Sequence, residues 1–281
     1  MKKKHLLTIF LSLVCLLFLS ACSVSVGEKA DQTDNWAKIQ KRGYVTIGVD
    51  DTFVPMGYRQ KNGQLVGYDI DLAKAVFKTY GIKANFQTVD WSMNATELKN
   101  GTIDLIWNGF TKTPERRSKV AFSRTYLKNN QVLVSLKKDH INSLADMQGK
   151  VLGAQTGSSG SNDINKYPKL LKDRIKDNEP VLYESFTNAF IDLNSGRIQG
   201  LLIDSSYADY YIAHQKHPED FQTIRGAFPD EQFGVGMRKS DVTMKQKIDQ
   251  ALVKLGKDGT LEQINQKWFG DKADSPLVKN K

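Results

Sequence analysis

Two adjacent arginines, Arg116 and Arg117, follow an apolar run of the sequence at a spacing that suits anion binding. The run at residues 103–107 predicts a buried strand, and Asn108-Gly109 breaks it into a polar loop that leads to the start of a helix. A guanidinium and the backbone NH groups of such a loop can bind one carboxylate through parallel hydrogen bonds. Alternatively, both arginines are solvated charges on a helix surface.

The sequence offers few groups for catalysis or metal binding. It contains four histidines and two cysteines, and His140, His214 and His217 fall in segments predicted to lie on the surface, outside the loops at strand ends. No HExxH, CxxC or P-loop motif occurs, so metal, redox and phosphate-loop chemistry have no support. The sequence therefore predicts no catalytic residue, no metal site and no cofactor.

Residues 1–21 have the composition of an export signal. A basic start is followed by an apolar run at 6–20, and small residues lead into Cys22. This resembles a bacterial lipoprotein signal peptide, which implies cleavage before Cys22 and attachment of diacylglycerol and palmitate to that residue. A permanent transmembrane helix is the alternative, although the run is shorter than the ~20 apolar residues of a membrane span. With Cys15 removed and Cys22 lipidated, the mature chain has no disulfide.

Residues 22–35 predict a flexible tether, because they are rich in Ser, Gly, Asp and Lys and have little periodicity. The formal charge of the chain is +9, and three of these charges leave with Lys2, Lys3 and Lys4. The other lysines are scattered and are not interleaved with aromatic residues, so no nucleic-acid partner is expected. Attraction to an anionic membrane or wall surface accounts for the basic excess.

The order of predicted elements gives two α/β units. From residue 36, helices alternate with strands at 44–49, 83–89 and 103–107, which is typical of a parallel sheet covered by helices. Ligands collect at the carboxyl ends of such strands. In this unit those ends are the loops at 50–55, 90–94 and 108–114.

A second parallel unit is predicted from Gln131 onward, with strand ends at the Ser/Gly-rich loop 155–160 and at Asp204. Further elements are then predicted: one strand at 233–237, a helix at 245–255, and a capping box at 260–263 that opens a terminal helix. Two lobes rather than one large domain follow from this restart of the pattern.

Several motifs occur together in the order of a known family. They are GVDDTFVP at 48–55, GYDIDLA at 67–73, DW at 90–91, TKTPER at 111–116, FS at 122–123, DGT at 258–260 and KWFG at 267–270. With the cysteine-terminated leader, this set resembles family 3 of the extracellular solute-binding proteins, the amino-acid receptors of ABC importers. The resemblance covers residues 36–270. It implies an α/β fold of the type II periplasmic-binding-protein kind, with lobe 1 at 36–130 and 229–281, lobe 2 at 131–228, and two crossover hinge strands between them.

The resemblance also implies a site for both ends of a zwitterion, since a buried unpaired charge costs several kcal/mol, about the effective penalty for one buried ion. Arg116 and Thr111 match the residues that bind the α-carboxylate. Backbone NH groups of Ser158 and Ser159 would approach the same carboxylate from the opposite lobe. Taken alone, that Ser/Gly loop is equally an ordinary turn between a strand and a helix.

The ammonium group and the ligand side chain are assigned in the same way. Asp204 matches the ammonium-binding aspartate of the family, and the carbonyl of Gly109 is the second acceptor. Phe53 and Trp91 match the positions that stack on the ligand side chain, although an aromatic residue such as Trp91 can also be part of the core.

Asp50 and Gln155 match positions that contact the tip of the side chain, and their chemistry favours a polar ligand. Glutamine, a basic amino acid and cystine are the candidates, whereas an acidic side chain is disfavoured near Asp50. Trp107 and Asn108 depart from the small residues common in the family, which leaves the identity of the ligand open.

The expected protein is a monomeric receptor, lipid-anchored at the extracellular face of the cell membrane of a Gram-positive bacterium, that delivers its ligand to an ABC permease. A secreted enzyme on the same fold is the alternative, resembling either a cyclohexadienyl dehydratase or a lytic transglycosylase. Asp50 is the one acid of interest for the latter. A surface adhesin or sensor domain is a third interpretation.

Overall fold

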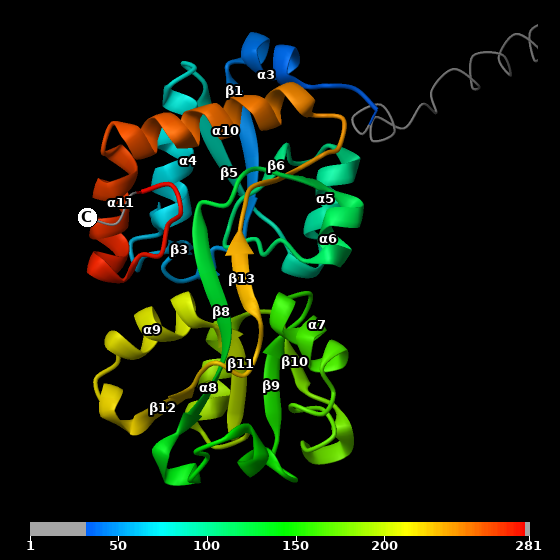
Figure 1. Cartoon of the computed structure of the whole chain (residues 1–281), viewed down its shortest axis with the longest axis vertical. Helices are drawn as coiled ribbons and strands as arrows, with labels where there is room; N and C mark the ends of the chain where they lie inside the picture. The colour runs from blue at the N-terminus through cyan, green and yellow to red at the C-terminus, as the bar shows by residue number, and fades with distance from the viewer. Residues whose placement is uncertain (1–31, 279–281) are drawn as a thin grey trace, which may run out of the picture.

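The computed structural model describes residues 32–278. The predicted signal peptide, the lipidation residue Cys22 and most of the predicted tether lie outside the described residues. Within residues 32–278, no helix is both long and apolar enough to cross a membrane. The chain forms two α/β lobes, one above the other in Figure 1, and each has its own sheet.

Lobe 1 is built on a five-stranded sheet in the order β5-β1-β6-β14-β7. Its strands are β1 Tyr44–Val49, β5 Lys83–Thr88, β6 Leu105–Ile106, β7 Ala121–Phe122 and β14 Gly236–Met237. Strand β1 is parallel to β5 and β6, as predicted, while β14 is antiparallel to both of its neighbours. A small antiparallel sheet beside it contains β2 Thr52–Phe53, β3 Gly57–Arg59 and β4 Leu65–Val66.

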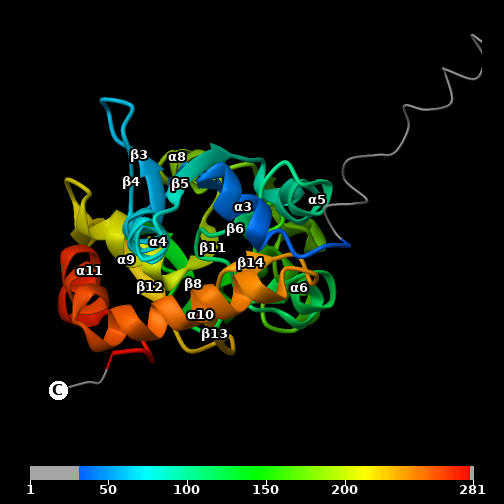
Figure 2. The same cartoon turned by 90° about the horizontal axis from the view of Figure 1, so that it is seen from above.

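Helices cover both sides of this sheet. They are α3 Trp36–Arg42, α4 Tyr68–Lys78, α5 Asn94–Asn100, α6 Pro114–Lys119, α10 Val242–Lys257 and α11 Thr260–Phe269, with 3-10 turns η1 Trp91–Met93 and η6 Gly270–Lys272. In Figures 1 and 2, α4 and α11 lie on one side of β5 and β6, and α5 and α6 lie on the other. Helix α4 packs inward through Ile70, Ala73 and Val76, which recur at helical spacing and are fully buried.

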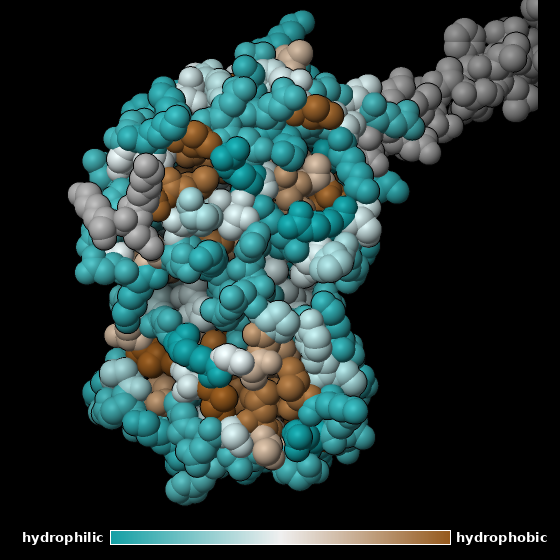
Figure 3. Space-filling model, viewed as in Figure 1, coloured by the Kyte–Doolittle hydropathy of each residue, from teal (hydrophilic) through white to brown (hydrophobic). Residues whose placement is uncertain are grey.

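Lobe 2 contains a sheet in the order β10-β9-β11-β8-β12, in which β8 is Leu127–Leu136. Its elements are β9 Leu152–Gln155, β10 Val181–Tyr183, β11 Gly200–Asp204, β12 Phe221–Ile224, α7 Ser159–Lys166, α8 Phe186–Asn194 and α9 Ser205–Ala213, with 3-10 turns η2 Lys137–Asp139, η3 Leu144–Met147, η4 Lys176–Asn178 and η5 Pro218–Asp220. Strands β9, β10 and β11 are parallel to one another, but β8 pairs antiparallel with both β11 and β12, so the expectation of a parallel unit was wrong for β8. The face in Figure 3 is largely hydrophilic, with apolar patches on both lobes, the larger of them on the lower lobe.

Two antiparallel strands connect the lobes. Strand β8 Leu127–Leu136 begins at lobe 1 and continues into the sheet of lobe 2, and β13 Asp230–Phe233 returns beside its first half. Figure 1 shows both strands running between the two lobes. They are the two connecting strands that the family resemblance implies.

Two local predictions differ from the structure. The predicted strand at 233–237 is divided, because Phe233 ends the ladder with β8 while Gly236 pairs with lobe 1 strands. The capping box at 260–263 is absent. Gly259, at a φ of 84°, is the N-cap of α11, and the Asp258 carboxylate accepts a 3.0 Å hydrogen bond from the Thr260 NH instead.

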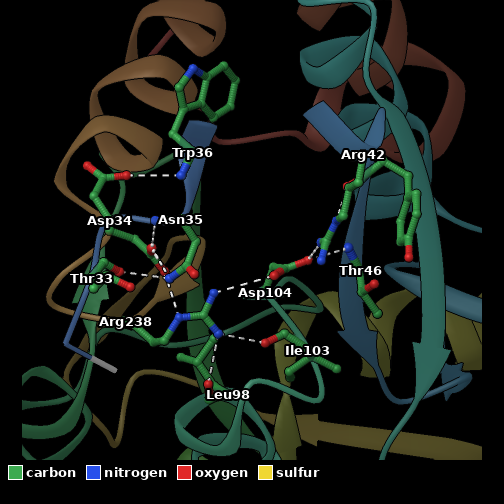
Figure 4. Close-up of polar contacts among 12 residues, drawn as sticks. Thr33, Asp34, Asn35, Trp36, Arg42, Thr46, Leu98, Ile103, Asp104 and Arg238 are labelled. Carbon is green, nitrogen blue, oxygen red and sulfur yellow. Dashed lines mark hydrogen bonds and ion pairs between the residues drawn. The ribbon is translucent and has the colours of Figure 1, made fainter. Parts of the chain in front are cut away.

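A buried arginine fixes the start of the described chain to lobe 1 (Figure 4). The Arg238 guanidinium donates to the carbonyls of Leu98 and Ile103 at 3.0 and 2.9 Å and is paired with Asp104 and Asp241. The other oxygen of Asp241 accepts bonds from the backbone and side chain of Asn35. A buried charge is tolerated when each of its groups has such partners.

Candidate ligand-binding site

The loops at the carboxyl ends of the strands meet where the lobes touch, and Arg116 lies at this meeting point. Helix α6 places it there, since the Thr113 hydroxyl caps the helix by accepting a bond from the Arg116 NH. Its guanidinium donates to the carbonyl of Thr111 at 3.1 Å and, across the cleft, to the carbonyl of Gly157 at 3.0 Å. The guanidinium also lies over the Phe110 ring, 4.4 Å from its centroid. Arg116 is therefore buried and oriented by both lobes.

The Ser/Gly-rich loop of lobe 2 faces Thr111. The Thr111 and Ser159 hydroxyls are 3.2 Å apart. Ser158 caps α7 through its hydroxyl, and its backbone NH already donates to the carbonyl of Gln155 at 3.2 Å. Gly157 has a φ of 72°, and a Cβ at this position would lie 2.9 Å from the Ser92 Cα of lobe 1. Only glycine allows this close approach of the two backbones.

Asp204 ends β11 on the opposite side of this cluster. Its Oδ1 accepts hydrogen bonds from the side-chain amides of Asn129 at 2.6 Å and Gln131 at 3.2 Å. The same two amides donate to Oε2 of Glu231 at 2.7 and 3.0 Å. Glu231, Asn129 and Gln131 were not predicted as site residues. In the sequence, one feature points to Glu231. It falls in a predicted crossover segment, at a position that the alternation of buried and exposed residues along a strand would bury.

The cluster therefore contains buried groups of both charges. Burial lowers the pKa of the Arg116 guanidinium to about 10, and the negative charges of Glu231 and Asp204 oppose that shift. Burial, reinforced by the charge of Glu231, raises the pKa of Asp204 well above its usual range. Among residues 32–278, no carboxylate forms an ion pair with Arg116 within 4.0 Å. The arrangement suits a molecule that carries a carboxylate and an ammonium group.

Gly109 is held by a buried carboxylate behind the cleft. Its NH donates to Oδ2 of Asp69 at 2.7 Å, and the Tyr126 hydroxyl donates to the same oxygen at 2.9 Å. Burial raises the pKa of Asp69 to about 7. Gly109 has a φ of 58°, and a Cβ there would lie 2.9 Å from the Phe53 ring. The loop thus requires glycine, and its carbonyl is oriented from behind by Asp69.

The two predicted aromatic positions differ in their surroundings. Phe53 contacts lobe 2, with its ring centroid 5.8 Å from that of Phe186 and 5.3 Å from that of Tyr207. Trp91 packs edge-on against Phe110 at 5.8 Å and belongs to a hydrophobic cluster of lobe 1. Phe53 therefore contacts the opposite lobe, and both Phe53 and Trp91 are also part of a hydrophobic core.

Asp50 and Gln155 meet across the cleft. The Gln155 amide donates to Oδ2 of Asp50 at 2.7 Å, and Thr52 donates to Oδ1 through both its NH and its hydroxyl. Burial raises the pKa of Asp50, and the bonds from Thr52 and Gln155 oppose that shift. Next to this pair, the Asn108 side chain accepts a bond from the Asp50 NH at 3.0 Å, so the unusual Asn108 positions the backbone of Asp50.

Comparison with known proteins identifies the chain. The family described as bacterial extracellular solute-binding proteins, family 3, matches residues 45–271, most of the sequence. The chain belongs to this family. Membership explains the two-lobed α/β fold, because solved relatives share it.

Named relatives bind several amino acids. The chain is 30% identical to ABC transporter arginine-binding protein 1 of Escherichia coli strain K12, over 80% of this chain and 90% of that protein. It is 28% identical to an L-cystine-binding protein of Bacillus subtilis strain 168, over 96% of this chain and 98% of that protein. A substrate-binding protein of an ABC uptake transporter from Streptococcus pneumoniae, solved with bound histidine, is 50% identical, with a TM-score of 0.84 over 86% of this chain and 98% of that one.

Several other charged and reactive groups of this solute-binding family member are exposed to solvent. Arg117 is exposed, in agreement with the alternative prediction that it is a solvated charge on the helix surface. His140, His214 and His217 are exposed as well. Within the described range of 32–278, no cluster of His, Cys, Asp or Glu side chains is arranged to hold a metal ion.

Proposed function

We propose that this chain is the lipid-anchored receptor of an ABC importer, and that it binds one polar amino acid between its lobes. What supports this proposal most is the convergence of Arg116, Thr111, Ser159 and Asp204 from both lobes on one buried cluster. Family membership and the amino acids named for its relatives point in the same direction. In this proposal lobe 1 comprises residues 36–130 and 229–281, and lobe 2 comprises residues 131–228.

The ligand would be bound by groups matched to its two charges. Arg116, with Thr111 and the loop at Ser158 and Ser159, would bind the carboxylate. Asp204 and the carbonyl of Gly109 would bind the ammonium group. Because the groups on the two lobes contact one ligand, the ligand favours the closed arrangement and shifts the population towards it.

The side chain of the ligand would lie beside Phe53 and Trp91 and reach Asp50 and Gln155. A buried carboxylate with a neutral amide favours a basic amino acid, histidine included, or glutamine, and cystine is the remaining candidate. Arginine, cystine and histidine are each named for a relative. The closed receptor would present this ligand to a membrane permease as a monomer, without catalysing a reaction.

Thermal-shift measurements followed by calorimetry test the proposal. The protein is titrated with the twenty amino acids and with cystine, and one or a few ligands should raise its melting temperature. Chromatography of the released ligand should return it unchanged, which separates a receptor from an enzyme. The proposal fails if no member of the panel binds.

Attachment to the membrane is tested separately. When the chain is expressed in Gram-positive bacterial cells, labelled palmitate should be incorporated into the wild type and into Cys15→Ala, but not into Cys22→Ala. Label retained in Cys22→Ala would contradict the predicted anchor.

A further inference from the structure

Glu231 is a buried acid on the strand that returns from lobe 2 to lobe 1. Strand β13 alternates exposed and buried residues, and Glu231 and Phe233 are the buried pair. Its register places Glu231 directly opposite Asn129 of β8, while Gln131 of β8 lies opposite Asp204 of β11. Since Asn129 and Gln131 are two residues apart on one strand, they point to the same face. The sheet thus brings Glu231 and Asp204 together from opposite edges of β8.

The two carboxylates share their hydrogen-bond donors. Each of the two amides donates to one oxygen of Asp204 and to one oxygen of Glu231, at distances of 2.6 to 3.2 Å. The Thr111 hydroxyl adds a weak contact to Glu231 at 3.4 Å. Amide groups are neutral, so they do not offset two buried negative charges at close range. Burial and the nearby charge of Glu231 therefore favour the protonated form of Asp204.

We propose that Glu231 is a second carboxylate of the ammonium-binding site, and that a bound amino acid expels the proton that Asp204 holds beside Glu231. This inference rests on the proposed function. The proton passes to solvent, and the ammonium group, which keeps its own three protons, donates hydrogen bonds to the two ionised carboxylates. One cation then faces two anions while Arg116 pairs with the carboxylate of the ligand.

Other charged groups face the pair, and each needs a control. Arg116 on α6 is close enough to interact with both acids and stays cationic at neutral pH. Asp163 on α7 interacts with Glu231, and burial together with that charge raises its pKa to about 6. Strand β8 contributes the neutral Asn129 and Gln131. Asp163 is therefore the alternative source of a released proton near neutral pH.

Calorimetry in buffers of different ionisation enthalpy measures the proton directly. At pH 7, titration of the best ligand from the amino-acid panel in phosphate and in Tris should give release of about one proton per bound ligand, the proton of Asp204. Glu231→Gln should lose most of this release and bind roughly ten- to a hundredfold more weakly, as expected for the loss of a charged hydrogen-bond partner. Glu231→Asp should restore proton release, because it retains the acid.

Two matched controls identify the source of the proton. Glu115→Gln removes an exposed acid of α6, and Asp163→Asn removes the neighbouring half-buried acid; both should keep the proton release of the wild type. Thermal melting confirms that each variant is folded. The inference is wrong if Glu231→Gln binds within about twofold of the wild type, if binding releases no proton, or if the release disappears in Asp163→Asn. Each of these results leaves amino-acid binding by the wild type intact, whereas failure of the wild type to bind refutes the proposed function itself.

Discussion

Truncation of Arg116 is the most direct test of the ligand site. The side chain is 9% exposed, and its guanidinium bridges the lobes through the carbonyls of Thr111 and Gly157. Arg116→Ala removes the only guanidinium that, among the described residues, lies in the cleft cluster. It also removes the hydrogen bond to lobe 2, so both ligand contact and closure are affected.

The expected loss follows from the burial of that charge. Removing one partner of a buried, hydrogen-bonded charge pair costs about 2–5 kcal/mol of binding free energy. A loss of about 4 kcal/mol is roughly a thousandfold increase in Kd. Arg116→Lys keeps the positive charge but cannot reproduce the planar fork, so it should fall between Arg116→Ala and the wild type.

Isothermal titration calorimetry with the ligand found by the amino-acid panel measures this effect. Arg117→Ala is the matched control, since Arg117 is the adjacent residue on the same helix and is exposed. It should bind within about twofold of the wild type, in keeping with the small energies of exposed charges. If Arg116→Ala retains affinity within a few-fold, or Arg117→Ala loses as much, the carboxylate site has been assigned to the wrong residue.

Three further predictions concern closure and stability. Gly157→Ala should weaken ligand binding at least tenfold, because its Cβ would lie 2.9 Å from the Ser92 Cα when the lobes are closed; an unchanged Kd in calorimetry would contradict this. Arg238→Met should lower the free energy of unfolding, measured by urea titration, by about 3–5 kcal/mol, because it leaves buried carboxylates unpaired. The control Arg42→Met removes a partly exposed ion pair and should lower that free energy by about 1 kcal/mol or less. Asp69 has a pKa of about 7 in the folded protein and near 3.8 in the unfolded chain. Between these pH values only the folded protein keeps the proton, so this group makes the free energy of unfolding fall as the pH rises. Urea titrations at pH 4.5 and 7.5 should show a smaller fall for Asp69→Asn than for the wild type, and equal falls would refute this assignment.

Much of the fold, and several residues of the candidate site, could be predicted from local sequence patterns. Strand β1 is found where its β-branched run predicted it, and β11 ends at Asp204 as predicted, because the apolar side chains of both strands are buried in the core of their lobe. The residues that end these strands, such as Asp50 and Asp204, could be named because parallel strands deliver their carboxyl ends to one edge. Their individual roles came from the family resemblance and remain predictions.

The rest depends on the register between distant segments, which the sequence pattern does not contain. Glu231 becomes a site residue only because β13 pairs with β8 so that it lies opposite Asn129, a contact between residues 102 positions apart. The cap of α11 was predicted wrongly for a different reason. The helix begins one residue earlier than predicted, with Gly259 at a positive φ as the N-cap, and the Gln263 NH donates to the Gly259 carbonyl instead of the Thr260 hydroxyl.

The chain segment that includes the hinge strand contacts both sides of the proposed ammonium site. Immediately before β8, the Tyr126 hydroxyl binds Asp69, which holds the Gly109 NH. Within β8, Asn129 binds Asp204 and Glu231. An ammonium group between the Gly109 carbonyl and Asp204 would therefore contact groups that are oriented by one short segment. Bending of that segment would change both contacts together, so the ligand would stabilise one hinge geometry rather than two independent lobes.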